Sequence, residues 1–289
     1  MATQLVPLQN VEKLSPSVIR VLGGNPGKFT LQGSNTYIVG TGTQRVLIDT
    51  GEGKPSWIAS LKDILQKENA TITKAIITHW HHDHQGGIKH LLEFSPSTNI
   101  YKNQPDCGQL DISDGQLFQV EGASLKAVFS PGHTQDHMAL VLEEEDAMFT
   151  GDNVLGHGTA VFEDLLVYLK SLETMRGKFR GRAYPGHGPV LEDGPGKIFE
   201  YIKHRQLREN QVIQVLKSKK SHPGIEAPSD SDNWTSMEIV KVIYKDVPEN
   251  LHLPANGGIL QILRKLEEEK KVVEDSVSGQ WSLKNRATL

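Results

Sequence analysis

Six consecutive residues carry the densest candidate chemistry of the chain: His79, Trp80, His81, His82, Asp83 and His84. They directly follow the apolar, β-branched run Ala75–Thr78, which predicts a strand. Histidines two positions apart at a strand end project to the same side, so His79 and His81 can hold one metal ion together. Asp83 and His84 come where the chain turns into a helix and can reach a second metal ion. The spacing of His82 points its ring away from the first pair, so we exclude it.

Three later segments repeat this design, an apolar strand that ends in a residue able to bind a metal. The residues are His133 in the run Ser130–Thr134, Asp152 after Thr150–Gly151, and His187 in the run Pro185–Gly188. In layered folds, residues at strand ends converge on one edge of a sheet. A lone Gly-His or Gly-Asp is more often simply a turn. Burying the six-residue cluster without a cation would be costly, however, so the four segments together indicate a metal site.

Seven candidate ligands are enough for two zinc ions that share a carboxylate and a water molecule. Zinc lowers the pKa of a bound water to about 7, which supplies a nucleophile at neutral pH without any side-chain nucleophile. Asp83 and Asp152 are the candidate catalytic carboxylates, and Asp83 can also accept or orient the proton of the water. Protonation of a leaving oxygen would need another donor. His137, Tyr37 and His157 are candidates, and the sequence does not choose among them.

The composition limits the possible partners. The chain has 289 residues, a net charge of −4 and one cysteine, Cys107, which excludes an internal disulfide framework. No apolar run approaches the length of a membrane span, so we expect no membrane insertion. Residues 1–196 hold 16 basic and 22 acidic residues, whereas residues 197–289 hold 15 and 13. This balance gives no bulk attraction for nucleic acid.

The first two-thirds of the chain alternate predicted strands with amphipathic stretches. Pro55–Lys67 has the apolar spacing of a helix packed on a sheet, and a second helix is expected from about Gly86 to Phe94. The mixture predicts sheets with helices on their outer faces. The strands that we expect here are Thr36–Val39, Val46–Asp49, Ala75–Thr78, Ser124–Phe129, Ala139–Leu142, Ala147–Phe149 and Ala183–Tyr184.

A different pattern begins near Gly196. A long helix is expected over Lys197–Ser218, followed by a loop over Ser221–Asp232. Thr235 or Ser236 then caps a helix that runs to Tyr244, with Glu238 placed for a capping box. A helix over Asn256–Lys270 and a hairpin over Lys271–Leu283 complete a winged-helix pattern. We therefore expect a catalytic domain over residues 1–196 and a linking helix with a winged-helix-like domain over residues 197–289.

The order of these motifs resembles that of the metallo-β-lactamase superfamily, over about residues 14–190. The resemblance implies an α+β fold, an αβ/βα sandwich with two zinc ions at one edge, to which the small C-terminal winged-helix domain is added. It implies that His79, His81 and His133 hold the first zinc, that Asp83, His84 and His187 hold the second, and that Asp152 bridges them. It also implies that Asp49, in the run Leu47–Gly51, supports the site or orients a ligand histidine.

Further features resemble a narrower family, that of beta-lactamase-like protein 2. They are the runs Gly33–Tyr37 and Val161–Leu165, the pairs His204-Arg205 and Arg208-Glu209, and the winged-helix tail. This resemblance implies an endoribonuclease of the mitochondrial matrix that cleaves single-stranded RNA, although the first 20 residues are a poor presequence by composition. We infer no obligate protein partner from the sequence. Relatives tend to have an acid where this chain has His157, which is either a surface histidine or part of the substrate mouth.

Two functional hypotheses therefore stand side by side. The first is a zinc endoribonuclease. Only 34 residues separate Asp152 from His187, which leaves no room for a large inserted domain and favours flexible single strands. The alternative is a thioester hydrolase of the glyoxalase II type, which shares these ligands. The acidic first part of the chain supports this alternative, whereas the terminal hairpin argues against it.

Overall fold

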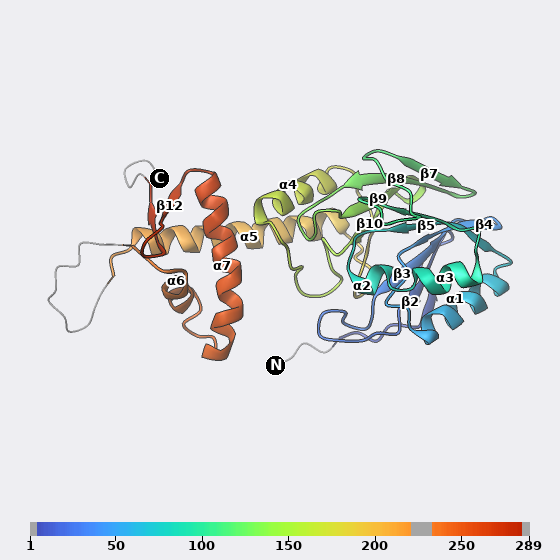
Figure 1. Ribbon diagram of the computed structural model, residues 1–289, viewed down its shortest axis with the longest axis horizontal. Coiled ribbons are helices and arrows are strands. Elements are labelled where there is room, and N and C mark those ends of the chain that lie inside the picture. Colours follow the sequence, from blue (N-terminus) through green and yellow to red (C-terminus); the bar gives the residue numbers. More distant parts are fainter. Residues whose placement is uncertain (1–4, 221–232, 285–289) are drawn as a thin grey trace. The chain divides into compact units, whose positions relative to one another are not determined.

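The computed structural model describes residues 5–220 and 233–284 (Figure 1). The chain divides into two compact units, residues 1–201 and 202–289. The expected boundary after residue 196 lies just before this division, within helix α5 (Gly194–Lys217). The loop expected over Ser221–Asp232 lies outside the described residues. Among the described helices, none is long and apolar enough to span a bilayer.

Two sheets form the inner layers of the first unit. The order in the first is β1-β2-β3-β4-β5-β6, and in the second it is β11-β10-β9-β8-β7. Neighbouring strands are antiparallel except for the pairs β4–β5, β5–β6 and β10–β11. The strands are β1 (Val11–Lys13), β2 (Val18–Leu22), β3 (Asn35–Val39), β4 (Gln44–Ile48), β5 (Thr71–Ile77), β6 (Asn99–Lys102), β7 (Leu117–Val120), β8 (Ala123–Phe129), β9 (Met138–Leu142), β10 (Ala147–Gly151) and β11 (Ala183–Pro185).

One apolar core lies between the sheets and another lies under the helices of the first sheet. Ile48, Leu140 and Phe149 belong to the core between the sheets. On the outer face of the first sheet, the buried side chains of helix α1 (Pro55–Lys67) and helix α3 (Ile88–Phe94) complete the second core. Helix α4 (Leu165–Arg176) lies on the outer face of the second sheet (Figure 1). This arrangement confirms the expected αβ/βα sandwich.

The second unit confirms the predicted helix, helix and hairpin. It contains helix α6 (Ser236–Ile243), helix α7 (His252–Glu268), and the antiparallel strands β12 (Val272–Asp275) and β13 (Gln280–Leu283). The capping box is present, because Thr235 Oγ1 accepts from Glu238 N (3.2 Å) and Glu238 Oε2 accepts from Thr235 N (2.8 Å). Short 3-10 turns cover Glu143–Glu145 in the first unit and Glu249–Leu251 in the second.

A buried ion pair explains Glu209, one of the residues behind the narrower resemblance. Its carboxylate accepts from Lys265 Nζ at 2.6 Å, and both side chains are less than one-tenth exposed. Lys271 approaches the same carboxylate at 3.7 Å. Glu209 therefore has a structural role in the second unit.

The helix expected from about Gly86 to Phe94 is present as α3 (Ile88–Phe94) and starts two residues later than predicted. Helix α2 (His82–Gln85) ends before Gly86, and α3 starts after Gly87. A Cβ on Gly86 would lie 2.7 Å from the carbonyl oxygen of His82 and 2.9 Å from that of Glu52, and a Cβ on Gly87 would overlap the carbonyl of Thr50. These glycines let the metal-binding motif pack directly against the chain after β4.

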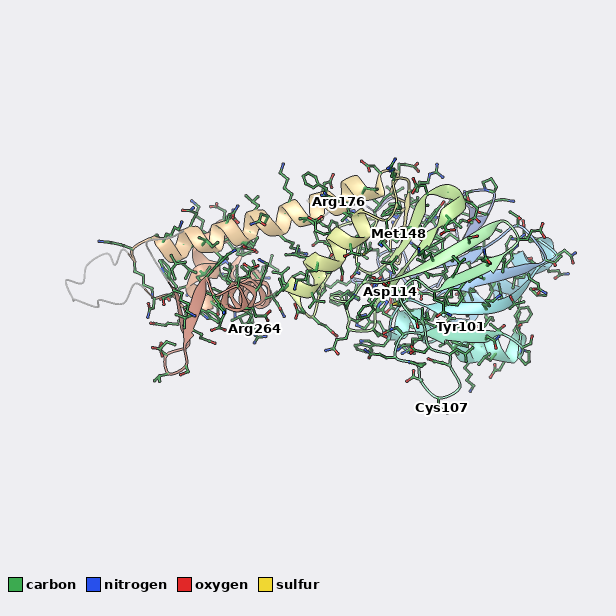
Figure 2. The ribbon with its side chains drawn as sticks, turned by 90° about the horizontal axis from the view of Figure 1, so that it is seen from above. Tyr101, Cys107, Asp114, Met148, Arg176 and Arg264 are labelled. Atoms are coloured by element: carbon green, nitrogen blue, oxygen red, sulfur yellow. The ribbon has the colours of Figure 1, made fainter. Side chains whose placement is uncertain are left out.

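The single cysteine of the chain lies on the surface of the first unit. Cys107 is exposed on the loop that follows β6 (Figure 2).

Candidate metal centre

The predicted ligands lie at the ends of strands that face each other across the two sheets. The end of β5 supplies His79 and His81, and α2 supplies Asp83 and His84. The second sheet supplies His133 from the β8–β9 connection, Asp152 after β10 and His187 after β11. Their donor atoms form two groups, within each of which all atoms lie within 4.8 Å of one another: His79, His81, His133 and Asp152, and Asp83, His84 and His187. His82 is exposed and lies outside both groups, as expected.

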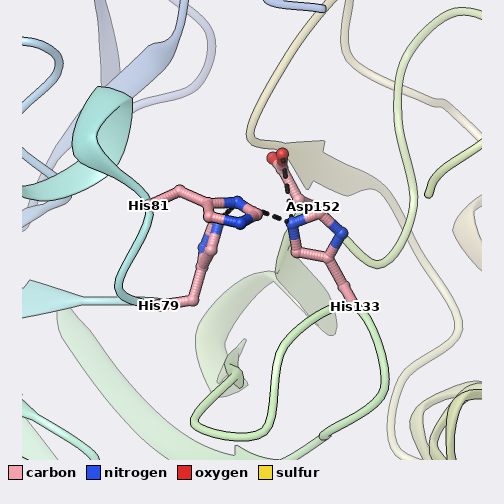
Figure 3. A group of neighbouring side chains, drawn as sticks. All are labelled: His79, His81, His133 and Asp152. Atoms are coloured by element: carbon pink, nitrogen blue, oxygen red, sulfur yellow. Dashed lines mark hydrogen bonds and ion pairs between the residues drawn. The ribbon is translucent and has the colours of Figure 1, made fainter. Parts of the chain in front are cut away.

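Three imidazoles meet in the first group (Figure 3). His81 Nδ1 lies 3.0 Å from His79 Nε2 and 3.1 Å from His133 Nε2. Ligand atoms on the corners of a tetrahedral zinc site are about 3.3 Å apart, so this spacing suits such an ion. Asp152 completes the group, with Oδ2 3.7 Å from His133 Nε2.

The second group has the same density of donor atoms. Asp83 Oδ2 lies 3.3 Å from His84 Nε2 and 3.2 Å from His187 Nε2, and the two imidazole nitrogens are 3.3 Å apart. Asp152 also reaches this group, since its carboxylate lies 3.4 Å from His84 Nε2 and 3.2 Å from His187 Nε2. The carboxylate of Asp152 therefore lies between the two groups, where a bridging ligand has to be.

The hydrogen bonds behind the histidines direct lone pairs into the site. His133 Nδ1 lies 2.7 Å from the carbonyl oxygen of Val161, and His84 Nδ1 lies 2.8 Å from Asp49 Oδ2. Because these acceptors require a proton on Nδ1, Nε2 is the atom of each ring that is left to bind a cation. In addition, Asp152 Oδ1 is buried and makes no hydrogen bond within the described chain. A cluster of lone pairs and one unbonded carboxylate oxygen fits a bound cation.

Asp49 supports one histidine of each group. Its Oδ2 accepts from His84 and from Thr78 Oγ1 (2.9 Å), and its Oδ1 accepts from Thr78 N (2.8 Å). Since the Thr78 hydroxyl donates to Asp49, it is left to accept from His79 Nδ1 at 3.0 Å. The backbone of Asp49 has a φ of 58°, a left-handed conformation in which aspartate is tolerated better than most residues. The geometry thus supports the orienting role expected for Asp49.

The charges of the cluster are strongly coupled. Burial by itself would raise the pKa of Asp152 and of Asp83, but the neighbouring His187 and His84 outweigh it and lower both pKa values. Burial would also lower the pKa of His187, but the carboxylates of Asp152 and Asp83 raise that pKa to about 9. The protons on the histidines balance the two carboxylates. A divalent cation at this place would supply the same positive charge and release those protons.

The three candidate proton donors lie in different environments. Tyr37 is buried and its hydroxyl donates to the Pro185 carbonyl (2.6 Å). His137 is also buried, and its Nε2 accepts from the backbone N–H of Asp152 at 3.2 Å. Burial lowers the pKa of His137 to about 3, so its ring is neutral and positions Asp152. Only His157 of the three lines the cavity that leads to the cluster.

Two supporting residues escaped the sequence analysis. Ser34 donates from Oγ to Asp83 Oδ2 at 2.9 Å, and Thr78 links His79 to Asp49. Both residues lie in sequence runs that the sequence analysis had singled out, Gly33–Tyr37 and Ala75–Thr78. A serine or threonine in such a run does not reveal which residue its hydroxyl group bonds to. Their roles arise from contacts between distant segments.

A cavity of about 470 Å3 opens onto the cluster. Its floor includes His81, His133, Asp83, Asp152 and His187. Its walls come from two loops, residues 28–31 and 155–163, and are rich in apolar side chains such as those of Leu31, Leu155 and Phe162. Among the described residues that line it, Lys28 is the only lysine or arginine. This wall suits an uncharged acyl group better than the charged phosphodiester backbone of a nucleic acid.

Comparison with known proteins agrees with this geometry. Residues 29–103 match the metallo-beta-lactamase superfamily, and residues 235–281 match the beta-lactamase associated winged helix domain. The chain is 46% identical over 281 residues to an atrochrysone carboxyl ACP thioesterase from Aspergillus chevalieri, covering 96% of this chain and 89% of that protein. It is 44% identical over 282 residues to lactamase-like protein aptB from Emericella nidulans, covering 96% and 90%.

A solved structure extends the likeness in fold. A beta-lactamase domain protein from Burkholderia ambifaria superposes with a TM-score of 0.77 at 16% identity, covering 98% of this chain and 96% of that one. At this identity the likeness concerns the fold alone.

These relatives correct the predicted activity. They are described as a thioesterase and as a lactamase-like protein, and neither as a nuclease, so the prediction of an endoribonuclease is wrong. The prediction of single-stranded RNA as the partner is wrong for the same reason. The physical reason is that the set of metal ligands determines how water is activated. It does not determine which kind of bond that water cleaves. Localisation in the mitochondrial matrix stays a prediction. It was implied by the narrower resemblance, whose predicted activity is wrong.

One family accounts for the two compact units and for the cluster of histidines and aspartates. It also accounts for the similarity to known proteins over nearly the whole chain. The chain belongs to the metallo-beta-lactamase superfamily of hydrolases and carries a beta-lactamase-associated winged helix domain after its sandwich domain.

Proposed function

We propose that the protein is a zinc-dependent thioesterase that releases an acyl group held as a thioester on an acyl carrier protein. The observation that carries this proposal is the joint occurrence of the two donor groups and the apolar cavity in a chain 46% identical to an ACP thioesterase. The alternative predicted from the sequence is a glyoxalase II-type enzyme. It would catalyse the same class of reaction, with a glutathione thioester as the substrate.

Two zinc ions would be held as the sequence predicts. His79, His81 and His133 would bind the first, Asp83, His84 and His187 the second, and Asp152 would contact both. When bound, such ions act as Lewis acids that lower the pKa of water and polarise the thioester carbonyl. Imidazoles with carboxylates are a donor set that zinc accepts, although iron and manganese accept it too.

The protein residues supply positions and a proton acceptor. Asp83, whose side chain is 24% exposed, is the more accessible of the two carboxylates and accepts or orients the proton of the attacking water. Ser34 holds one oxygen of this carboxylate in place. Attack of the water oxygen on the carbonyl carbon and cleavage of the C–S bond yield the acid and a thiol.

Two of the three candidate proton donors, Tyr37 and His137, are buried, which favours a sulfur leaving group, and only His157 lines the cavity. Tyr37 and His137 are held in buried hydrogen bonds, so neither is free to protonate a leaving oxygen. A thiol has a pKa of about 8.5, so a thiolate can depart without a donor, whereas a far more basic alkoxide cannot. Cleavage of a thioester therefore makes the smallest demand for a proton donor at this site.

The test uses a small thioester, the acyl derivative of N-acetylcysteamine, with the protein loaded with zinc. Released thiol is measured with a chromogenic thiol reagent. We expect turnover that a strong chelator abolishes and added zinc restores. Asp152→Asn should reduce turnover at least ~1,000-fold. The exposed Asp63→Asn, which alters only an ion pair with Lys67, serves as the matched control. Equal turnover by the Asp152 variant and the wild type would refute the proposal.

A further inference from the structure

A second, shallower hollow of about 490 Å3 lies between the end of helix α4 and the start of helix α5. Phe179 is its buried apolar residue, and Phe199 on α5 lines it with half of its side chain exposed. The chain is closely packed here, since a Cβ on Gly194 would lie 2.4 Å from the ring of Phe179. Arg176 and Arg180 complete the charged part of the lining, and the described residues that form it include no acid. We refer to this hollow as the basic groove.

The arginines of the basic groove keep positive charge at the surface. Residues 176–182 hold four basic residues and no acidic one, in a chain with a net charge of −4. The guanidinium carbon of Arg176 lies 5.3 Å from the centre of the Phe199 ring, and its Nε reaches Glu173 only at 3.7 Å (Figure 2). Arg180 is exposed and makes no ion pair within the described part of the chain. Arginine on an aromatic face is typical of protein interfaces, because the planar guanidinium can still bind a carboxylate of the partner.

The carboxylates near the basic groove are held by other groups. Glu192 accepts from Arg182 at 2.9 Å, and Glu200 accepts from Lys197 at 2.8 Å. Asp193 Oδ1 accepts from a backbone N–H in the first turn of α5 at 2.8 Å. These acids therefore do not neutralise the two arginines of the groove, which forms a local positive patch on an acidic domain.

The basic groove is connected to a wall of the cavity over the metal centre. Tyr201 follows Phe199 by two residues on α5, a step of about 3 Å along the helix axis. The Tyr201 hydroxyl accepts from Leu155 N at 3.2 Å and donates to the Gly158 carbonyl at 2.9 Å. Leu155 and Gly158 both line the cavity. Helix α4 in turn starts just after this loop. A molecule bound in the basic groove therefore lies next to the loop that walls the cavity.

We propose that the basic groove docks the acyl carrier protein whose thioester the metal centre hydrolyses. This proposal rests on the thioesterase function proposed above. Acyl carrier proteins are small helical proteins with acidic surfaces, and they hold the acyl group at the end of a long, flexible arm. Arginines around an exposed aromatic ring complement such a surface, and the opposite charges speed docking. From the groove, the arm passes over the loop of residues 155–163 into the cavity. The basic groove thus recognises the carrier, and the cavity recognises its acyl group.

The test compares two thioesters of one acyl group. The 2-naphthoyl group, whose acid is detected by its fluorescence, is attached either to the carrier protein or to N-acetylcysteamine. Arg176→Glu/Arg180→Glu should lower kcat/KM for the carrier-bound thioester at least about tenfold, mainly through KM, because like charges then face each other. Turnover of the N-acetylcysteamine thioester should stay within about twofold of the wild type, since neither arginine lines the cavity. An unchanged value for the carrier-bound thioester, or an equal loss with both, would overturn the proposal.

Two further variants separate the groove from net charge. Lys67 on α1 and Lys89 on α3 are exposed, and each pairs with an acid four residues away. Lys67→Glu/Lys89→Glu changes the net charge as much as the groove variant and should leave both thioesters unaffected. A loss of similar size in this control would show that the docking is not local to the groove. Phe199→Ser keeps the charge and removes the exposed ring, so it should raise KM for the carrier-bound thioester alone.

Binding separates this proposal from the proposed activity. Fluorescence anisotropy of a labelled holo carrier protein, with the thiol of its arm free, needs no turnover. We expect the arginine variant to bind it about tenfold more weakly than the wild type, and added salt to weaken only the wild-type complex strongly. Groove-dependent binding without hydrolysis of either thioester would refute the activity and support the docking site. Hydrolysis of the small thioester with carrier binding that ignores both arginines would refute the docking site alone. Self-association through the groove without carrier binding would also refute it.

Discussion

At the scale of single residues, the site depends on groups that hold the metal-binding side chains in place by hydrogen bonds. Asp49 holds His84 directly and His79 through Thr78, so one carboxylate fixes a histidine in each donor group. His137 fixes the backbone of Asp152, and Val161 fixes His133. Such supporting bonds set the direction of the lone pairs and hence the affinity for metal.

We therefore expect Asp49→Asn to weaken both metal sites together. The amide that replaces one carboxylate oxygen cannot accept from His84 and Thr78 as the carboxylate does. Zinc affinity should fall about 10–100-fold at both sites. Titration against a competing chelator would measure the two affinities, with Asp63→Asn as the control. Loss of affinity at neither site, or at one alone, would contradict the role of Asp49.

Much of the site could be predicted at this scale, and the remainder has a physical reason. The seven candidate ligands could be identified, and the structure brings them together, because histidines and aspartates clustered after strands are costly without a cation. Ser34, Thr78 and His137 differ, since their functions come from hydrogen bonds to segments that lie elsewhere in the chain. No local pattern encodes such partners.

At the scale of helices and strands, strong periodicity was informative, whereas short apolar runs predicted strands such as β3 and β9 and failed to predict others. Helix α1 agrees with its prediction at both ends, because its apolar spacing is clear and Pro55 stands in its first turn. Helix α4 was missed. It opens with five consecutive apolar residues, Leu165–Leu169, which hide the spacing of its buried positions Leu165, Tyr168, Leu172 and Met175. Strands β1, β2, β6 and β7 were missed as well, each at most five residues long.

The capping box of α6 gives a prediction for stability. Burial raises the pKa of Glu238, but hydrogen bonds from Lys220 and Thr235 outweigh it, so the pKa is lowered. A group with a lowered folded-state pKa stabilises the fold above its unfolded value of about 4.5, and that stability disappears as the pH falls through the folded value. The winged-helix unit should therefore lose stability on acidification below about pH 4.5.

Glu238→Gln tests this directly. At neutral pH the variant should lose about 1 kcal/mol of unfolding free energy in denaturant titrations. The reason is that the neutral amide makes weaker hydrogen bonds with Thr235 and Lys220 than the carboxylate does. Below about pH 4 the difference from the wild type should shrink, because the glutamate is then becoming neutral. The exposed Glu268→Gln is the matched control. A difference that does not depend on pH would exclude the charge of Glu238 as the cause.

At the scale of the whole molecule, the fold and the reaction type follow from the sequence more readily than the substrate. Family motifs predicted the sandwich, the winged helix and a hydrolase correctly. The narrower resemblance predicted an endoribonuclease incorrectly, because the features behind it include structural ones such as the buried Glu209. What selects a substrate is the cavity wall, and its shape results from two loops whose arrangement depends on the complete fold.

The most direct test of the central claim is a product analysis with three substrates in parallel. Zinc-loaded protein is incubated with an acyl carrier protein that bears a naphthoyl thioester, with a glutathione thioester, and with single-stranded RNA, and products are identified by mass spectrometry. We expect rapid release of naphthoic acid from the carrier protein, dependent on Asp152, and slower release from glutathione. An intact carrier-bound thioester beside cleaved RNA would contradict it.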